Sequence, residues 1–255
     1  MSAPRRPFLA GNWKMHGTRE EAARLARELR GIIGGETERD VAVFPPFTAL
    51  AAVREALEGS PIGLGAQNCH PEVKGAFTGE ISAPMLRDAG CAYVLVGHSE
   101  RRQLFGETDD TVARKLRAAL AADLRPVLCV GETLEERKGG RTEETVRRQI
   151  EAALASLSPA DLERITIAYE PVWAIGTGLT ATPAQAQEVH GFLRVRLRAL
   201  FPTAVADRTR IQYGGSVKPD NIDGLMLEPD VDGALVGGAS LSATSFGAIV
   251  RYGRG

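Results

Sequence analysis

The sequence has little of what marks disulfide-stabilised, nucleic-acid-binding or membrane proteins. Only three of its 255 residues are cysteines, Cys69, Cys91 and Cys129; an odd number without short spacings argues against a disulfide framework or a zinc site. The formal net charge is −1, so no dominant positive field attracts nucleic acid or an anionic membrane. No stretch approaches the length of a membrane span, and the N-terminus has no long apolar segment. We therefore expect a reduced, cytoplasmic protein that binds neither nucleic acid nor a membrane.

Motifs of several common enzyme classes are also absent. No G-x-x-x-x-G-K-[ST] stretch occurs, which excludes a P-loop. GHSER and GGSVK both fail the G-x-S-x-G pattern of a hydrolase nucleophile elbow. The four histidines are far apart and form no H-x-x-x-H pair, so the sequence predicts no metal site.

The chain does contain a regular alternation of strand-like and helical segments. Three apolar stripes at helical spacing begin at Ala22, Val112 and Val146, and the third ends at Leu157. Thr18 with Glu21, and Thr182 with Gln185, fit capping boxes at helix N-termini. Between the helical segments lie eight short apolar runs, which are Phe8–Gly11, Val41–Phe44, Ile62–Ala66, Ala92–Val96, Val127–Val130, Ile165–Tyr169, Arg210–Tyr213 and Gly233–Val236.

Short apolar strands without clean alternation indicate a parallel sheet covered by helices. Eight strand–helix units in about 250 residues is the size of one (β/α)8 barrel. A doubly wound open sheet is the alternative, but it usually has a glycine-rich first turn, whereas here the first strand runs into NWKM. No linker or change of composition divides the chain. We predict the α/β class and a single (β/α)8 barrel domain over residues 1–255.

The polar residues that follow the strands suggest where function lies. In such a barrel, catalytic groups belong at the C-terminal ends of the strands, so these residues should meet at one mouth. They are Asn12 and Lys14 after the first strand, His98 and Glu100 after the fourth, Glu170 after the sixth, Ser216 after the seventh, and Gly237 and Gly238 after the eighth.

Each of these residues also has an ordinary structural interpretation. A lone lysine is usually solvated surface, a lone histidine is usually structural, and Glu170 alone suits a strand-end ion pair. The glycines in YGGS and VGG suit tight turns, although glycine-rich turns in the last two loops of a barrel typically bind phosphate. Together, a base, an imidazole, an ammonium and two anion-binding turns favour proton abstraction next to a carbonyl in a small phosphorylated substrate.

The motifs resemble those of the triosephosphate isomerase family along essentially the whole chain and in the same order. The matching stretches are GNWKM at 11–15, AQN at 66–68, GAFTGE at 75–80, VGHSERR at 96–102, CVGETLEER at 129–137, AYEPVWAIGTG at 168–178, YGGSV at 213–217 and VDGALVGGASL at 231–241.

The resemblance implies a function and a role for each residue. The reaction would interconvert dihydroxyacetone phosphate and D-glyceraldehyde 3-phosphate through an enediolate, in glycolysis and gluconeogenesis, without a metal or organic cofactor. Glu170 would be the catalytic base, His98 the electrophile and Lys14 the cation, with Asn12 and Glu100 supporting them. Asn12 and Lys14 would also contact the substrate, and its phosphate would be held by the backbone of Gly176, Ser216, Gly237 and Gly238.

The resemblance further implies a lid over Pro171–Gly178 that excludes water, and a homodimer formed through the loop 68–80.

Two alternative functions remain when the residues alone are considered. The first is another phosphate-binding barrel isomerase or epimerase, many of which need metal ligands or a different acid–base pair. The second is a non-catalytic binding barrel, which predicts loss of Glu170 or His98; both are present.

Overall fold

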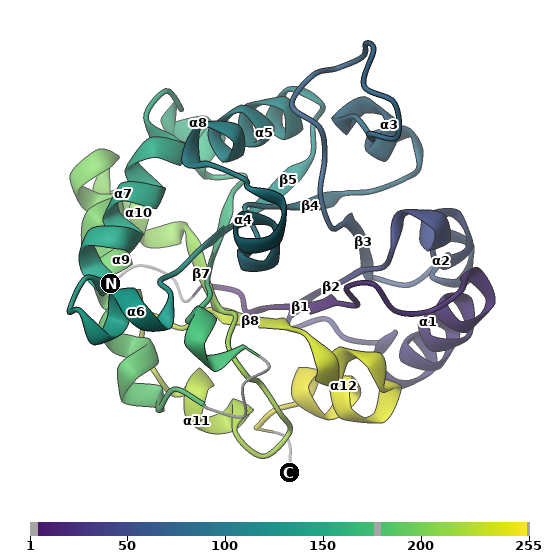
Figure 1. Ribbon diagram of the computed structural model, residues 1–255. Coiled ribbons are helices and arrows are strands. Elements are labelled where there is room, and N and C mark those ends of the chain that lie inside the picture. The colour runs from purple at the N-terminus through teal and green to yellow at the C-terminus, as the bar shows by residue number, and fades with distance from the viewer. Residues whose placement is uncertain (1–4, 176–179, 254–255) are drawn as a thin grey trace.

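The computed structural model describes residues 5–175 and 180–253, and its centre is a closed barrel of parallel strands surrounded by helices (Figure 1). Each strand pairs with the next in the chain, and β8 closes on β1. The strands are β1 (Phe8–Asn12), β2 (Asp40–Phe44), β3 (Gly63–Ala66), β4 (Tyr93–Val96), β5 (Arg125–Val130), β6 (Thr166–Tyr169), β7 (Arg210–Tyr213) and β8 (Gly233–Val236). The predicted strands are thus confirmed to within two residues at each end.

Helices follow the strands and form the outer layer (Figure 1). They are α1 (Arg19–Ile33), α2 (Leu50–Ala56), α3 (Ala83–Asp88), α4 (Ser99–Phe105), α5 (Asp109–Ala121), α6 (Leu134–Lys138), α7 (Thr142–Leu154), α8 (Pro159–Leu162), α9 (Pro183–Leu200), α10 (Thr203–Arg208), α11 (Ile222–Met226) and α12 (Ala243–Val250), with 3₁₀ turns η1 (Phe47–Ala49), η2 (Val172–Ala174) and η3 (Gly238–Leu241). None of the described helices is both long and apolar enough to cross a membrane.

Two apolar layers explain why the strands are apolar on both faces. Side chains inside the barrel form one buried cluster that includes Phe8, Phe44 and Leu95. The opposite faces of the same strands pack against the helices, as Leu9 and Val43 do. Closure of the barrel depends on Gly233, whose Cα pairs with that of Phe8. A Cβ at this position would lie 1.9 Å from the Phe8 carbonyl oxygen, so no other residue fits without moving the strands.

The capping boxes and apolar stripes that predicted helices from the sequence are confirmed, with one exception. Both predicted capping boxes form, at Thr18 for α1 and at Thr182 for α9. The third apolar stripe was predicted to run to Leu157, but α7 ends at Leu154. Leu157 instead lies in the turn before α8, where Ser158 caps the new helix and Pro159 occupies its first position. It still packs against the core, because burial does not require helical continuity.

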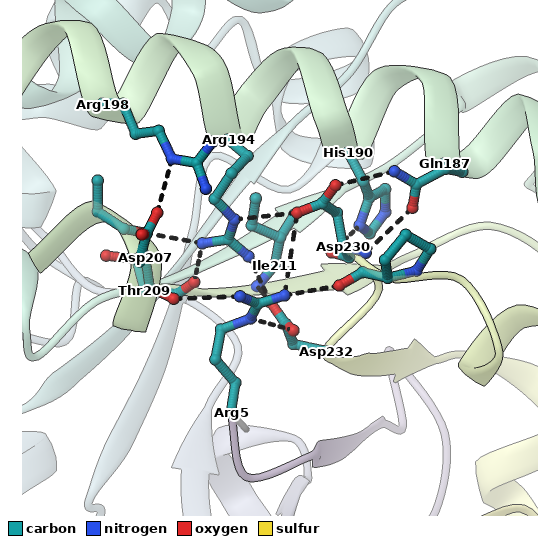
Figure 2. A network of polar contacts seen from close by, with 12 residues as sticks. Arg5, Gln187, His190, Arg194, Arg198, Asp207, Thr209, Ile211, Asp230 and Asp232 are labelled. Carbon is teal, nitrogen blue, oxygen red and sulfur yellow. Dashed lines mark hydrogen bonds and ion pairs between the residues drawn. The ribbon is translucent and has the colours of Figure 1, made fainter. Parts of the chain in front are cut away.

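A network of polar and charged side chains joins the segment before β1 to α9 and to the residue before β8 (Figure 2). These positions precede the strands, so the network lies at the end of the barrel opposite the C-terminal ends of the strands. Arg5 precedes β1, and its Nε lies 2.5 Å from Asp232 Oδ1. Arg194 of α9 is 2% exposed, and its Nη2 lies 2.7 Å from Asp232 Oδ2. Burial raises the pKa of the Asp232 carboxyl despite these two guanidinium groups. Removing one partner would leave a buried charge unpaired, so the network holds β1, β8 and α9 together.

His190 lies beside this network and supports a prediction about stability. Its side chain is fully buried, and Nδ1 lies 3.0 Å from the Asp230 carbonyl oxygen. Burial lowers its pKa to about 4 from 6.5, although the hydrogen bond to Asp230 acts in the opposite direction. Between these values the unfolded chain binds more protons than the folded one. His190 therefore stabilises the fold fully above pH 6.5, and this contribution is lost as pH falls towards 4.

Replacing His190 by Gln should therefore flatten the dependence of the unfolding free energy on pH. The wild type should lose about 3 kcal/mol more than the variant between pH 6.5 and pH 4, which is the pKa difference expressed as free energy. Urea unfolding at several pH values measures this. His16→Gln, the same change at an exposed histidine, is the matched control. An unchanged slope in His190→Gln would show that other groups cause the acid sensitivity.

Candidate active site

The C-terminal ends of the strands surround a cavity of about 560 Å³. The predicted residues that line it are Asn12, Lys14, His98, Glu170, Ser216, Gly237 and Gly238. Glu100 does not line the cavity but contacts Lys14. Gly176 lies outside the described residues. The cavity also includes His16 and Lys218, to which the sequence analysis gave no role.

Glu170 follows β6, and its carboxylate is held from one side only. The residue is 1% exposed, and its Oε2 accepts a hydrogen bond from the backbone N–H of Ser99 at 2.8 Å. Its Oε1 lies 3.2 Å from His98 Nε2, but no hydrogen bond is formed to it within the described residues. One oxygen therefore fixes the orientation of the carboxylate, and the other is buried without a hydrogen-bond partner among the described residues.

His98 is oriented by the start of α4. Its Nδ1 accepts a hydrogen bond at 3.2 Å from the backbone N–H of Glu100, so the side chain caps the helix. A ring nitrogen that accepts a hydrogen bond carries no proton; the proton of the neutral ring is then on Nε2. Nε2 is the nitrogen nearer Glu170. His98 can therefore donate a hydrogen bond to a substrate oxygen placed next to the base.

Lys14 adopts a backbone conformation that is rare outside glycine, with φ of 51°. Two side chains hold it there. The Lys14 backbone N–H donates to Asn12 Oδ1 at 3.0 Å, and Gln67 Nε2 donates to the Lys14 carbonyl oxygen at 2.8 Å. Its Nζ lies 2.5 Å from Glu100 Oε1. Strained backbone of this kind persists only where the surroundings fix it, and it concentrates at functional sites.

The glycine-rich turns after β7 and β8 line the cavity, and the turn after β7 leaves no room for side chains at Gly214 and Gly215. A Cβ at Gly214 would lie 2.9 Å from Glu170 Cγ, and a Cβ at Gly237 would lie 3.4 Å from Lys14 Cε. Gly214 therefore lets the base lie against β7. Gly237 and Gly238 have no side chains, so they line the cavity with backbone beside Ser216, which is an arrangement that suits an anion such as phosphate.

The described part of the predicted lid is anchored by Glu132, which the sequence analysis did not single out. Its carboxylate is completely buried and accepts hydrogen bonds from Trp173 Nε1 at 2.9 Å and from the Tyr169 hydroxyl at 3.1 Å. Arg137 Nη1 lies 3.1 Å from the same carboxylate. Burial, with Glu132 beside it, raises the pKa of Tyr169. Glu132 therefore fixes the position of Trp173, near the start of the segment that follows Glu170.

Comparison with known proteins assigns the chain to one family. A family model described as triosephosphate isomerase matches residues 7–253. The chain belongs to the triosephosphate isomerase family. A triosephosphate isomerase of Syntrophotalea carbinolica is 56% identical over 97% of this chain and 98% of its own length. One of Chloroflexus aurantiacus is 58% identical over 96% and 98%.

Solved structures agree with this result. The crystal structure of triosephosphate isomerase from Bartonella henselae matches with a TM-score of 0.89 and 42% identity, covering 98% of this chain and all of that one. The predicted α/β barrel and the predicted family resemblance are thereby confirmed. Among the described residues, no group of three or more histidine, cysteine or acidic side chains could hold a metal ion.

Proposed function

We propose that this member of the triosephosphate isomerase family interconverts dihydroxyacetone phosphate and D-glyceraldehyde 3-phosphate with Glu170, His98 and Lys14 as its catalytic residues. The observation that carries the proposal is the 3.2 Å separation of Glu170 Oε1 and His98 Nε2 in one cavity with Lys14. A carboxylate oxygen with no hydrogen bond suits a base, and a neighbouring N–H suits the carbonyl oxygen that becomes negative when the base removes a proton.

In the forward step Glu170 Oε1 takes a proton from C1 of dihydroxyacetone phosphate. The C1–H electrons form the C1–C2 double bond, and the carbonyl electrons move onto the C2 oxygen. His98 Nε2–H and the Lys14 ammonium stabilise that oxygen in the enediolate. His98 Nε2–H gives its proton to the C2 oxygen, and the ring then takes the C1 hydroxyl proton in its place. As the C1=O bond of the aldehyde forms, the electrons of the C1–C2 double bond take the abstracted proton back from Glu170 at C2, so the reaction balances without an oxidant or reductant.

The rest of the cavity would hold and protect the substrate. The backbone of Ser216, Gly237 and Gly238, together with Gly176, would bind the phosphate. The segment Pro171–Gly178 would close over the enediolate, because excluding water strengthens each electrostatic contact and prevents loss of phosphate. Glu132 supports this role by fixing Trp173 at the start of the segment.

The function is tested by an assay on the purified chain. Glyceraldehyde 3-phosphate is supplied with a chelator present, and the dihydroxyacetone phosphate formed is reduced by a coupling dehydrogenase that consumes NADH. We expect rapid conversion that the chelator does not affect. Absence of conversion in a folded sample would contradict the proposal and return attention to other phosphate-binding barrel enzymes.

We also propose that two chains assemble through the loop 68–80. This loop joins β3 to α3 and stands out from the barrel in Figure 1. Residues 72–80 are all exposed, including Phe77, although Phe77 stacks on His70 with ring centroids 4.2 Å apart. Large apolar side chains exposed elsewhere on the molecule include Met15, next to Lys14, and Met85 of α3. Exposed apolar groups of this kind suit a two-fold interface in which each loop reaches the partner's Asn12 and Lys14 region.

Replacing Phe77 and Thr78 by Asp should give monomers with much lower activity. Two added charges oppose burial of the loop, and an unsupported Lys14 region loses the geometry that catalysis needs. Sedimentation at several concentrations, with activity measured on the same samples, is the test. Val195→Asp adds one such charge at an exposed apolar residue of α9 and is the control. A wild-type monomer with full activity at nanomolar concentration would rule the interface out.

The cysteines support placing the protein in the cytoplasm. Cys69, Cys91 and Cys129 are all unpaired and buried. Unpaired thiols without disulfides are typical of proteins that work in a reducing compartment.

A further inference from the structure

Apart from one lysine, the formal charges around the cavity give no net attraction for an anionic substrate. With histidine counted as neutral, three described lining residues carry a formal charge: Lys14, Glu170 and Lys218. Lys14 is already paired with Glu100. Without Lys218, the cavity and Glu100 together would have a formal charge of −1, and with it they have none. The whole chain, at −1, offers no attraction either, so a phosphate dianion depends on local positive charge.

Lys218 is placed to supply that charge. It is exposed and lines the cavity, two residues after Ser216. Asn221 holds the turn between them, because its Oδ1 accepts from the Lys218 backbone N–H at 2.8 Å and its Nδ2 donates to the Ser216 carbonyl oxygen at 3.0 Å. Among the described residues the Lys218 ammonium forms no ion pair, and Asp220, two residues later in the sequence, is not paired with it. Its charge is therefore available to a ligand.

We propose that Lys218 is a binding residue for the phosphate dianion of the substrate, acting from the mouth of the cavity. The inference rests on the proposed function and adds to it a side-chain cation beside the backbone groups at Ser216, Gly237 and Gly238. Lys218 follows Ser216, which the proposed function assigns to the phosphate, so it would attract substrate and transition state equally. Such uniform binding changes KM and leaves kcat unaltered.

The test compares Lys218→Gln and Lys218→Glu with the wild type over a range of ionic strength. At about 0.01 M salt, kcat/KM should fall by about three- to tenfold in Lys218→Gln and further in Lys218→Glu, with kcat unchanged. At about 1 M salt the Debye length shrinks to about 3 Å and the difference should fall below about twofold. Inhibition by inorganic phosphate should weaken in the same order.

Lys138→Gln is the matched control, because it removes the same charge from an exposed lysine at the end of α6 that does not line the cavity. If Lys218→Gln has the kcat/KM and salt dependence of Lys138→Gln, the inference is wrong. A fall in kcat that persists at every salt concentration would also overturn it, since that would indicate a role in the chemistry or the fold. Wild-type protein without isomerase activity would contradict the proposed function instead. Direct binding of inorganic phosphate to the wild type and Lys218→Gln would then still test the inference.

Discussion

Replacing Glu170 by Asp should lower kcat by about 100-fold or more while the barrel stays folded. The shorter side chain keeps the charge but withdraws the carboxylate by about one methylene, and a displacement of about 1 Å costs that much at a reacting centre. The loss corresponds to roughly 2.7 kcal/mol of activation free energy. Glu170→Gln should lose more, about 10³- to 10⁴-fold, because it retains the shape and removes the base. Steady-state kinetics with circular dichroism on the same samples measures both effects.

The pair of variants separates the proposed role of Glu170 in catalysis from its role in the fold. Its Oε2 accepts a hydrogen bond from the Ser99 backbone, and the Gln side chain can keep that contact. Both variants should therefore unfold close to the wild-type temperature. Turnover near the wild-type value in Glu170→Asp would mean that another group removes the proton.

Removing the positive charge of Lys14 should have an effect of similar size. Lys14→Met keeps a long side chain and should lower kcat/KM by about 10²- to 10³-fold, the usual loss when one electrostatic donor to a developing oxyanion is removed. KM should rise and kcat should fall together, because the ammonium lies where it can bind the substrate and also stabilise the enediolate. Kinetics in both directions of the reaction provides the measurement.

Lys138→Met is the control for Lys14→Met, since it removes the same charge at an exposed position outside the cavity. It should have wild-type kinetics. A kcat/KM in Lys14→Met that stays within a few-fold of the Lys138→Met value would exclude Lys14 from catalysis. In that case the ion pair with Glu100 would have only a structural role.

The sequence predicted the strands and the site because both depend on simple rules. Buried parallel strands are short and apolar, so runs such as Tyr93–Val96 stand out. The C-terminal ends of parallel strands in a barrel meet at one face. Residues after separate strands, such as Lys14 and Glu170, could therefore be assigned to one cavity although 156 positions separate them in the sequence.

Residues that act through burial or close contact could not be found in this way. Glu132 lies inside CVGETLEER, where an acidic residue before a helix is unremarkable, and only the fold shows that it is buried under Trp173. Gln67 and Gly214 are similar cases. The importance of Gln67 follows from its contact with the strained Lys14 backbone, and that of Gly214 from its distance to Glu170. Such contacts join distant segments, and no local pattern encodes them.

The most direct measurement of the central claim, that Glu170 moves a proton between neighbouring carbons, is nuclear magnetic resonance of the reaction in D2O. A carboxylate that holds the abstracted proton can exchange it with solvent before returning it, so a substantial fraction of the product should carry one deuterium at the carbon that receives the proton. Glu170→Gln should slow both product formation and deuterium incorporation by about 10³- to 10⁴-fold under the same conditions. Rapid product formation with no deuterium in it would contradict the account, because hydrogen would then move directly between the carbons as hydride.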